Sequence, residues 1–400
     1  MMRVVLLTHV FPRAAADPLG AFLLHSLEPL APRGSFLVVA PHASGLREHE
    51  RIGTIPVTRF RYASDVQETL AYTGVMHEQV ARGLGGKILF ARFLFAYFRA
   101  ALGAVRAHKP QTLHAHWWLP GGFVGALVSK WTGIPLVITT HGTDVEQLRR
   151  TRWAKLPARF TFGQARAITC GSNYLREQLI ELGVANEKRV RVIPMPVNPL
   201  FVNCVSHITS RESKFENRNS KIEILTVARL TKQKRIDTLI DALEILRARG
   251  MDARLRIVGD GDQRAALEQK TRAQNLEAAV EFLGMRPQNE LPNLYAQCDV
   301  FVLPSVREGM GLVLAEALLC GAPVIAANSG GVTDIVRAGE TGLLFSERDA
   351  NALADALEKY ARDPQYAARL AENGRALVME RFTPPRVAEQ FLQIYEFASR

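Results

Sequence analysis

Residues 300–321 read VFVLPSVREGMGLVLAEALLCG, and this stretch decides how the fold is interpreted. An apolar, strand-like run ends at a small turn, Gly309-Met310-Gly311, and the apolar segment 312–320 is predicted to form a helix. The N-terminus of a helix presents unpaired backbone N–H groups and a partial positive charge, a geometry that suits a phosphate group. A strand, a tight turn and a helix in this order therefore indicate a phosphate site on an α/β domain.

Two glutamates flank this turn. Glu308 stands just ahead of it, and Glu316 lies about one turn inside the expected helix. Eight helical residues span about 12 Å, which is roughly the distance at which one carboxylate would meet a sugar and the other a ribose, with a diphosphate between them. The alternative is that two acids flank an ordinary helix N-terminus, where negative charge is stabilising in any case.

Strand-like and helix-like segments alternate through both halves of the chain. The predicted strands are residues 3–8, 36–40, 112–115, 136–140, 167–170 and 190–193, followed by 222–227, 254–258, 280–283, 299–303 and 323–326. The predicted helices are residues 20–31, 87–108, 121–132 and 172–183, followed by 236–249, 262–274, 290–297, 312–320, 350–362, 364–380 and 385–400. This alternation predicts the α/β class, with a doubly wound parallel sheet in each half.

The length of 400 residues suits two domains rather than one core. Residues 203–220 are polar, rich in Ser, Asn and Arg, and lack periodicity, as expected of a domain boundary. We therefore expect an N-terminal domain over 1–200, a linker over 201–220 and a C-terminal domain over 221–384. In such sheets ligands bind beyond the carboxyl ends of the strands, where each candidate polar group below is found.

The composition is that of a globular protein, with 48% hydrophobic and 22% charged residues. A formal net charge of +11 favours anionic partners such as nucleotide phosphates or acidic lipid headgroups. Nucleic acid is the least supported partner, because the sequence has no zinc-finger spacing, basic zipper or RNA-binding signature.

The four cysteines are widely spaced, which signals neither a metal site nor a redox pair and favours a cytoplasmic chain with free thiols. The N-terminal apolar run is too short for a secretion signal and is interpreted as a first buried strand. The segment that most resembles a membrane-spanning helix runs from Ile88 to Val105, and Arg92 and Arg99 interrupt its apolar residues.

Two cations follow the first strand of the second half. Arg229 and Lys234 would complement a diphosphate and stabilise it as a leaving group, although a solvated loop in a basic protein is the alternative. Gly20, at the start of the first helix, would let a backbone approach a phosphate, although glycine is also common at a helix start.

Histidines follow strands of the first half. His141 comes directly after LVITT and would orient a sugar hydroxyl or donate to a phosphate, while a plain turn through Gly142 and Asp144 is the alternative. His114 and His116 share one face of a strand, but no carboxylate partner in the sequence suggests a metal.

These residues match a known family along nearly the whole chain. The matching pieces are TTHGTDV, VARLTKQKRIDTLIDAL, VGDGDQR and the block 291–345. In them the chain resembles the retaining glycosyltransferases of family 4, whose GT-B fold has two Rossmann-like domains facing across a cleft. The resemblance implies a metal-independent enzyme, so that Asp260 and Asp262 are not expected to hold a metal, and a closing helix, 385–400, that packs back on the first domain.

The resemblance also implies roles for individual residues. Glu308 would contact hydroxyls of the donor sugar, Glu316 the ribose, and His141 would lie near the reacting sugar. The remaining donor-binding residues implied are Gly20, Arg229, Lys234, Met285, Arg286, Met310, Gly311 and Leu312. The sequence departs from the family where it has a single glycine in the first loop, Arg235 in place of glycine, and Met-Pro-Val-Asn at 195–198.

The expected activity is hexosyl transfer from a nucleotide-diphosphate sugar to a glycan, lipid-linked or small-molecule acceptor, with retention of configuration and no cofactor. The alternatives are a nucleotide-sugar epimerase of the same fold and a non-catalytic sugar-nucleotide binding module. A cytoplasmic location is expected. The segment Gly83 to Lys109 suits either a helix on the surface of an anionic membrane or a plain buried helix.

Overall fold

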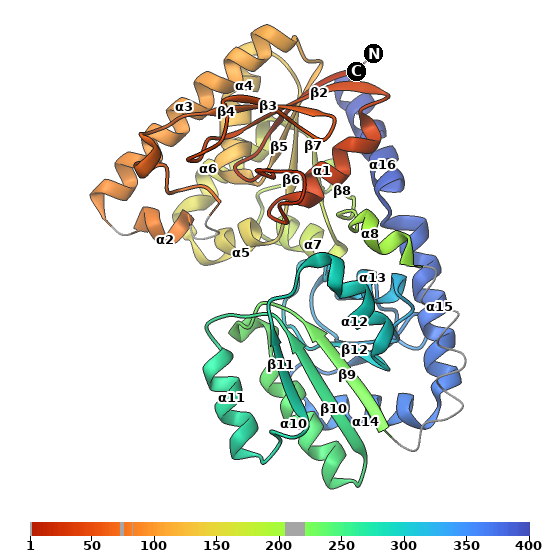
Figure 1. Ribbon diagram of the computed structural model, residues 1–400. Coiled ribbons are helices and arrows are strands. Elements are labelled where there is room, and N and C mark those ends of the chain that lie inside the picture. Colours follow the sequence, from red (N-terminus) through yellow and green to blue (C-terminus); the bar gives the residue numbers. More distant parts are fainter. Residues whose placement is uncertain (1, 73–75, 82, 205–220) are drawn as a thin grey trace. The chain divides into compact units, whose positions relative to one another are not determined.

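The chain forms two compact units, each built on one sheet. Figure 1 shows the computed structural model, which describes residues 2–72, 76–81, 83–204 and 221–400. The first unit comprises Met1–Pro196 together with Pro384–Arg400, and the second comprises Val197–Thr383.

The sheet of the first unit has eight strands in the order β3-β4-β2-β1-β5-β6-β7-β8. The strands are β1 Met2–Leu7, β2 Gly34–Pro41, β3 His49–Ile52, β4 Ile55–Phe60, β5 Thr112–His116, β6 Leu136–Thr140, β7 Ala165–Cys170 and β8 Val190–Val192. Neighbouring strands run parallel, except for the antiparallel pair β3–β4. The central strands β5 and β6 are buried along their whole length, as parallel strands covered on both faces must be.

Helices cover both faces of this sheet. They are α1 Ala21–Leu27, α2 Met76–Ala81, α3 Leu84–His108, α4 Phe123–Thr132, α5 Thr143–Arg150, α6 Lys155–Gln164, α7 Asn173–Glu181 and α16 Pro384–Ser399. One core cluster joins the sheet to α3, α4, α6 and α7, and a second joins the other face to α1 and α16. The last helix therefore belongs to the first unit, where the hydroxyl of Tyr395 lies 2.8 Å from Nδ1 of His114.

The second unit has a six-stranded parallel sheet in the order β11-β10-β9-β12-β13-β14. The strands are β9 Lys221–Val227, β10 Asp252–Val258, β11 Val280–Gly284, β12 Val300–Leu303, β13 Val324–Ala327 and β14 Leu343–Phe345. The helices are α8 Pro199–Val202, α10 Ile236–Ala248, α11 Arg264–Ala273, α12 Leu291–Gln297, α13 Leu312–Leu319, α14 Ala350–Arg362 and α15 Pro364–Arg381. The predicted fold class, a doubly wound α/β chain with two Rossmann-like domains, is confirmed.

The boundary between the units lies earlier than expected. Residues 197–204, assigned to the first domain and the linker, belong to the second unit. They do so because the amide of Val197 donates to the carbonyl of Phe382 at 2.9 Å and the ring of Phe201 packs on Tyr295. The rest of the expected linker, 205–220, lies outside the described residues.

Several elements are absent from the sequence-based prediction. The hairpin β3–β4 is short, and its exposed strand β3 lacks a run of apolar residues. Helix α5 has four charged residues among eight, and α6 contains Pro157 and Gly163, so both have weak helical signals. Buried apolar side chains in the core outweigh local propensity; they are Val145 and Leu148 on α5, and Ala158 and Phe162 on α6.

Candidate active site

The turn between β12 and α13 has the geometry expected from residues 300–321. Gly311 is the N-cap of α13 and has a φ of 78°, in the left-handed region that favours glycine. A Cβ atom there would lie 3.2 Å from side-chain carbons of Leu303 and Leu314. Met310, the middle residue of the Gly309-Met310-Gly311 turn, is buried. Leu312 is the first residue of α13, and the first helical turn of α13 carries no acidic side chain. The first-turn amides can therefore receive an anion without competition from a carboxylate on the same turn.

Glu308 and Lys234 form an ion pair, although the sequence analysis assigned them to different parts of a ligand. Nζ of Lys234 lies 2.6 Å from Oε2 of Glu308, and the two side chains are 18% and 16% exposed. The carbonyl of Glu308 also accepts a hydrogen bond from the amide of Gly331 at 2.7 Å. Lys234 ends a 3-10 turn, Lys232–Lys234, that precedes α10. The pair places a cation and a hydrogen-bonding carboxylate beside the start of α13.

The loop that carries Lys234 is fastened to the loop that carries Glu308. The amide of Val306 donates to the carbonyl of Gln233 at 3.0 Å, and Nε2 of Gln233 donates to the carbonyl of Arg307 at 3.2 Å. Arg235 then adopts a φ of 52°, in the left-handed region that favours glycine. Its guanidinium pairs with Asp237 at 2.9 Å and is directed to α10 instead of a ligand.

Arg229 follows β9 and is exposed. Within the described ranges, no residue pairs with its guanidinium, so this cation is available to an anionic ligand. The glycine-rich run 258–264 supports the same loop: the amide of Leu230 donates to the carbonyl of Asp260, and a Cβ on Gly259 would lie 1.9 Å from the carbonyl oxygen of Ala228. The glycines therefore serve close backbone packing under Arg229.

Glu316 lies on α13 and is 9% exposed. The hydroxyl of Tyr295 on α12 donates to its Oε2 at 3.2 Å. Burial raises the pKa of Glu316 to about 7, and the hydrogen bond from Tyr295 opposes that shift. Glu316 can therefore change protonation state near neutral pH, which the sequence alone did not indicate.

Met285 and Arg286 follow β11. Met285 is 81% exposed, and the guanidinium of Arg286 lies 3.6 Å from the carboxylate of Glu290. An exposed Met next to a cation can cover the face of a flat aromatic ligand. No contact joins these two residues to the Lys234–Glu308 pair in the described structure.

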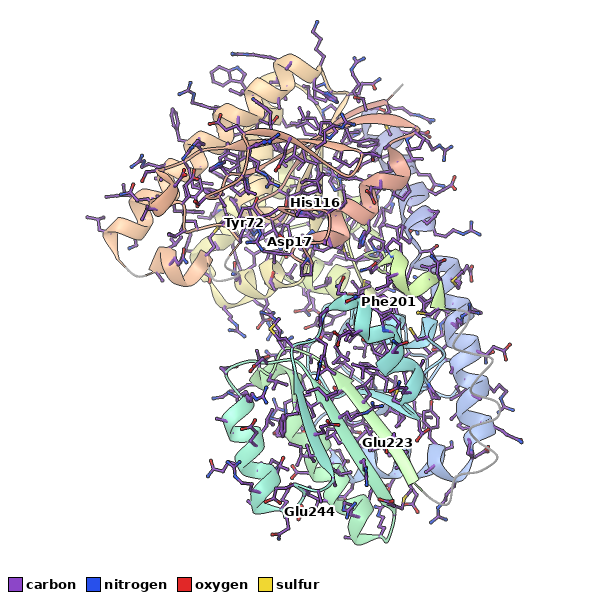
Figure 2. The ribbon with its side chains drawn as sticks, in the orientation of Figure 1. Asp17, Tyr72, His116, Phe201, Glu223 and Glu244 are labelled. Carbon is purple, nitrogen blue, oxygen red and sulfur yellow. The ribbon has the colours of Figure 1, made fainter. Side chains whose placement is uncertain are left out.

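In the first unit, Gly20 is the N-cap of α1 and has a φ of 78°. A Cβ there would lie 3.1 Å from Val10 and 3.2 Å from the backbone of Phe11, so the loop packs closely on itself. Asp17, labelled in Figure 2, accepts hydrogen bonds from Nε of Arg13 at 2.6 Å and from the amide of Leu19 at 3.1 Å. Burial acts to raise the pKa of Asp17, but these hydrogen bonds outweigh it and the pKa is lowered.

His141 begins the loop after β6 and lies in a cluster of aromatic rings. Its Nε2 is 2.9 Å from Nδ1 of His116, and its ring centroid is 4.1 Å from that of Trp117. Asp144 holds the backbone by accepting from the amide of His141 at 3.0 Å, as the predicted turn requires. Burial lowers the pKa of His141 to about 3, with a smaller contribution from His9, so the ring is neutral at physiological pH.

The sequence analysis missed His9 and Trp117 as members of this cluster. His9 follows β1, and its ring centroid is 4.5 Å from that of Trp117. Burial lowers the pKa of His9 to about 4. The position of His9 just after a predicted strand was a usable signal, whereas the position of Trp117 depends on a positive φ of 62° that sequence does not reveal.

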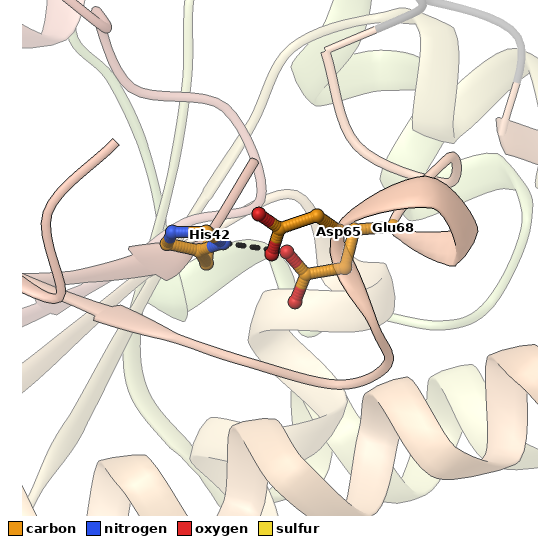
Figure 3. A group of neighbouring side chains, drawn as sticks. All are labelled: His42, Asp65 and Glu68. Carbon is orange, nitrogen blue, oxygen red and sulfur yellow. Dashed lines mark hydrogen bonds and ion pairs between the residues drawn. The ribbon is translucent and has the colours of Figure 1, made fainter. Parts of the chain in front are cut away.

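One group of described side chains, His42, Asp65 and Glu68, has the spacing of metal ligands (Figure 3). Nδ1 of His42 lies 2.5 Å from Oε2 of Glu68, and its Nε2 lies 2.8 Å from the carbonyl of Leu46. Because each member already has a protein partner, the group is interpreted as structural: a buried hydrogen bond between His42 and Glu68 joins the loops after β2 and β4, and Asp65 pairs with Arg61.

Two Rossmann-like domains, each with a largely parallel doubly wound sheet, are the architecture of the GT-B class of glycosyltransferases. The chain matches the family described as Glycosyltransferase Family 4 over residues 34–200 and that described as Glycosyl transferases group 1 over residues 209–377. It is 31% identical over 310 residues to the D-inositol 3-phosphate glycosyltransferase of Frankia alni, covering 71% of this chain and 75% of the relative. The chain belongs to glycosyltransferase family 4, and the protein is a glycosyltransferase.

Solved structures agree on the fold. Sucrose-phosphate synthase from Thermosynechococcus elongatus matches with a TM-score of 0.78 and 23% identity, over 99% of this chain and 98% of that one. Anabaena Alr3699/HepE in complex with UDP-glucose matches with a TM-score of 0.70 and 23% identity, over 99% and 100% of the two chains. At this identity the likeness supports the GT-B fold.

Proposed function

We propose that the protein transfers a hexosyl unit from a nucleoside-diphosphate sugar to a glycan, lipid-linked or small-molecule acceptor, with retention of configuration. The observation that carries this proposal is the Lys234–Glu308 pair, 2.6 Å apart beside the amides that open α13. A cation, the amides of a helix N-terminus and a carboxylate together fit a diphosphate joined to a polyhydroxyl ring. Binding of UDP-glucose by the related HepE supports a nucleotide-sugar donor.

The donor would be held by residues of the second unit. Arg229, Lys234 and the first-turn amides of α13 receive the diphosphate, Glu308 accepts hydrogen bonds from sugar hydroxyls, and Glu316 accepts from the ribose. Met285 and Arg286 contact the base. Two side-chain cations and a helix N-terminus supply the positive charge that a departing diphosphate needs, so the proposal requires no metal ion.

Retention is explained by substitution on the face from which the diphosphate leaves. The bond between the anomeric carbon and the phosphate oxygen breaks, the acceptor oxygen bonds to that carbon, and the acceptor proton passes to the leaving phosphate oxygen. Arg229 and Lys234 stabilise the negative charge that grows on the diphosphate. His141, neutral at physiological pH, orients an oxygen of the sugar or phosphate.

A donor screen and product analysis test this proposal. Thermal-shift measurements across UDP-, GDP- and ADP-sugars identify the donor, because a ligand that binds the folded state raises the melting temperature. NMR of the product then reports the anomeric configuration. Inversion of configuration would overturn retention, and conversion of the donor without any acceptor would favour the epimerase alternative.

We also propose a cytoplasmic location with peripheral contact at the inner face of an anionic membrane, through α3. Among the described residues, α3 is the one helix long and apolar enough to cross a membrane by length and composition, and 28% of its most apolar window is buried. Leu84, Ile88 and Phe95 are 75%, 53% and 64% exposed. The same helix contains no Asp or Glu and carries these cations: Lys87, Arg92, Arg99 and Arg106. Exposed apolar side chains interleaved with cations fit an anionic bilayer surface.

Co-sedimentation with vesicles of phosphatidylglycerol and phosphatidylcholine tests the membrane contact. Phe95→Ser should reduce binding several-fold, because it removes a large exposed apolar group from α3. Phe397→Ser is the matched control, since Phe397 is 50% exposed on α16, which covers the other face of the sheet. No binding of the unaltered protein at low salt, or equal losses in the two variants, would overturn the proposal.

A further inference from the structure

Three histidines gather at the carboxyl ends of two neighbouring strands in the first unit. His114 and His116 lie on β5, and His141 follows β6, which pairs with β5. His116, labelled in Figure 2, is 3% exposed. The rings of His116 and His141 are stacked with an interplanar angle of 28°, and Nδ1 of His116 lies 2.9 Å from Nε2 of His141.

The other interactions at His141, which include a ring contact with Phe22 at 5.2 Å between centroids, hold its position but leave its protonation state open. The indole of Trp117 packs on one side of the ring, and Asp144 fixes the backbone amide. In the described part of the chain, His116 provides the one side-chain hydrogen bond to the imidazole of His141. His114 belongs to a separate network, in which Nε2 lies 2.7 Å from the hydroxyl of Thr139.

A single proton lies between the two rings. Burial holds the pKa of His116 well below its ordinary value and lowers that of His141 to about 3, so both rings are neutral at physiological pH. A neutral imidazole has one donor nitrogen and one acceptor nitrogen. The nitrogen that carries the proton is therefore set by the hydrogen bond that the other nitrogen makes.

The surroundings of His116 favour one direction for this hydrogen bond. His116 is 3% exposed, and no described residue accepts a hydrogen bond from its Nε2, so a proton on Nε2 would leave an N–H donor without a protein acceptor. The proton of His116 then resides on Nδ1 and is donated to Nε2 of His141. The proton of His141 is consequently on Nδ1, which becomes a hydrogen-bond donor to a ligand.

We propose that His116 is a positioning residue that fixes His141 as an Nδ1–H donor toward an oxygen of the bound sugar nucleotide. The proposal rests on the proposed function for the role of His141, but the tautomer itself is a property of the protein alone. A fixed donor avoids the reorganisation that a freely rotating imidazole would need at the transition state. His116 thereby affects turnover without touching the substrate.

Three variants test the proposal. His116→Asn places an amide near the position of Nδ1 that can still donate to His141, whereas His116→Leu removes the donor. Thr112→Val is the matched control, because Thr112 lies on the same strand and its buried hydroxyl has no partner in the structure. Nitrogen-15 NMR of histidine-labelled protein reads the tautomer, and His141→Asn assigns the His141 signal by its loss.

We expect His141 to be the Nδ1–H tautomer in the unaltered protein and in His116→Asn, and to change to Nε2–H in His116→Leu. With the identified donor, kcat should fall about 10- to 100-fold in His116→Leu, the magnitude typical of lost positioning partners, while KM for the donor changes little. His116→Asn should restore most of the loss, and Thr112→Val should leave kcat unchanged.

The outcomes separate this proposal from the proposed function. An Nε2–H tautomer at His141 in the unaltered protein overturns the inference whatever the enzyme does. Unchanged kcat in His116→Leu also overturns it. If the expected tautomers are observed but no sugar is transferred, the result supports the positioning of His141 and contradicts the proposed function. If His116→Leu fails to fold, the tautomers of the unaltered protein and of His116→Asn still decide.

Discussion

Lys234 and Glu308, which are 74 residues apart in the sequence, meet through a 2.6 Å contact between Nζ and Oε2. Both side chains are partly exposed, so the pair contributes at most about 1 kcal/mol to stability. A weak pair can rearrange at little cost when a diphosphate competes for the ammonium group. In the proposed donor complex, Glu308 would retain an acceptor oxygen for a sugar hydroxyl while Lys234 would bridge the carboxylate and the phosphate.

The first prediction concerns Glu308→Ala. Transfer should fall by at least about 100-fold, the size of effect seen when a group that stabilises a transition state is removed. The fold should remain, because the ion pair is partly solvated and the backbone contact with Gly331 does not need the side chain. Steady-state rates and the midpoint of thermal unfolding measure the two effects.

Glu308→Gln is the matched variant, since it keeps the shape and one acceptor oxygen but removes the charge that pairs with Lys234. Its rate should lie between those of the unaltered protein and Glu308→Ala. If Glu308→Ala transfers sugar at the parental rate, the assignment of Glu308 to the donor sugar is wrong.

Much of the fold could be predicted because parallel strands buried on both faces are apolar along their length. The run 300–303 and the turn at Gly311 specify β12 and α13 locally, and the glycine is required by its positive φ. By contrast, α5 and α6 form because a few apolar side chains, such as Leu148 and Phe162, reach the core. Such tertiary contacts leave no strong local pattern.

The candidate site was predictable as a set of residues but not as a geometry. Residues at strand ends, such as His141 and Arg229, could be chosen by position alone. Their partners could not, because the hydrogen bond between His116 and His141 and that from Tyr295 to Glu316 join different strands and helices. The pKa of Glu316 depends on the burial of α13, which only the packed unit defines.

The second prediction is a pH dependence of donor binding that comes from Glu316. Burial raises its pKa to about 7, so the carboxylate that we propose accepts from ribose hydroxyls is present above pH 7 and is lost below it. The dissociation constant of the nucleoside diphosphate should therefore increase as the pH falls from 8 to 6. Isothermal titration calorimetry across this range measures it.

Glu316→Gln provides the control, because its amide does not titrate. It should bind the nucleotide more weakly at pH 8 and show a flatter pH dependence, and an unchanged slope would assign the titration to another group.

The raised folded-state pKa of Glu316 also makes the stability of the fold depend on pH. Glu316 stabilises the fold most below its unfolded pKa of 4.5, and this contribution is lost as the pH rises through about 7. Glu316→Gln should remove this loss, which is about 3 kcal/mol.

The third prediction concerns the support of the Glu308 backbone. Gly330 has a φ of 69°, and a Cβ there would lie 2.3 Å from the carbonyl oxygen of Glu308. Gly330→Ala should therefore cost about 3 kcal/mol or more and also lower the transfer rate, because the Glu308 loop must move.

Gly339→Ala separates these two causes. Gly339 has a similar φ of 74°, but the nearest atom to an added Cβ is the hydroxyl of Tyr366 at 3.6 Å. This variant should lose only about 1 kcal/mol, the cost of a left-handed non-glycine residue, and keep its rate. Denaturant unfolding and steady-state kinetics test both variants, and equal effects would show that the contact with Glu308 is unimportant.

The fourth prediction concerns Arg229, which is exposed and has no side-chain partner among residues 2–72, 76–81, 83–204 and 221–400. Arg229→Ala should weaken nucleoside-diphosphate binding about 10-fold, in the range of one lost charge-assisted contact, and leave the free energy of unfolding within about 0.5 kcal/mol of that of the unaltered protein.

Arg254→Ala is the matched control, since Arg254 is exposed on β10 and likewise has no partner in the described structure. Because both variants lower the net charge equally, a loss confined to Arg229→Ala and reduced by added salt would identify a direct phosphate contact. Equal losses would instead assign the effect to the overall charge of the protein.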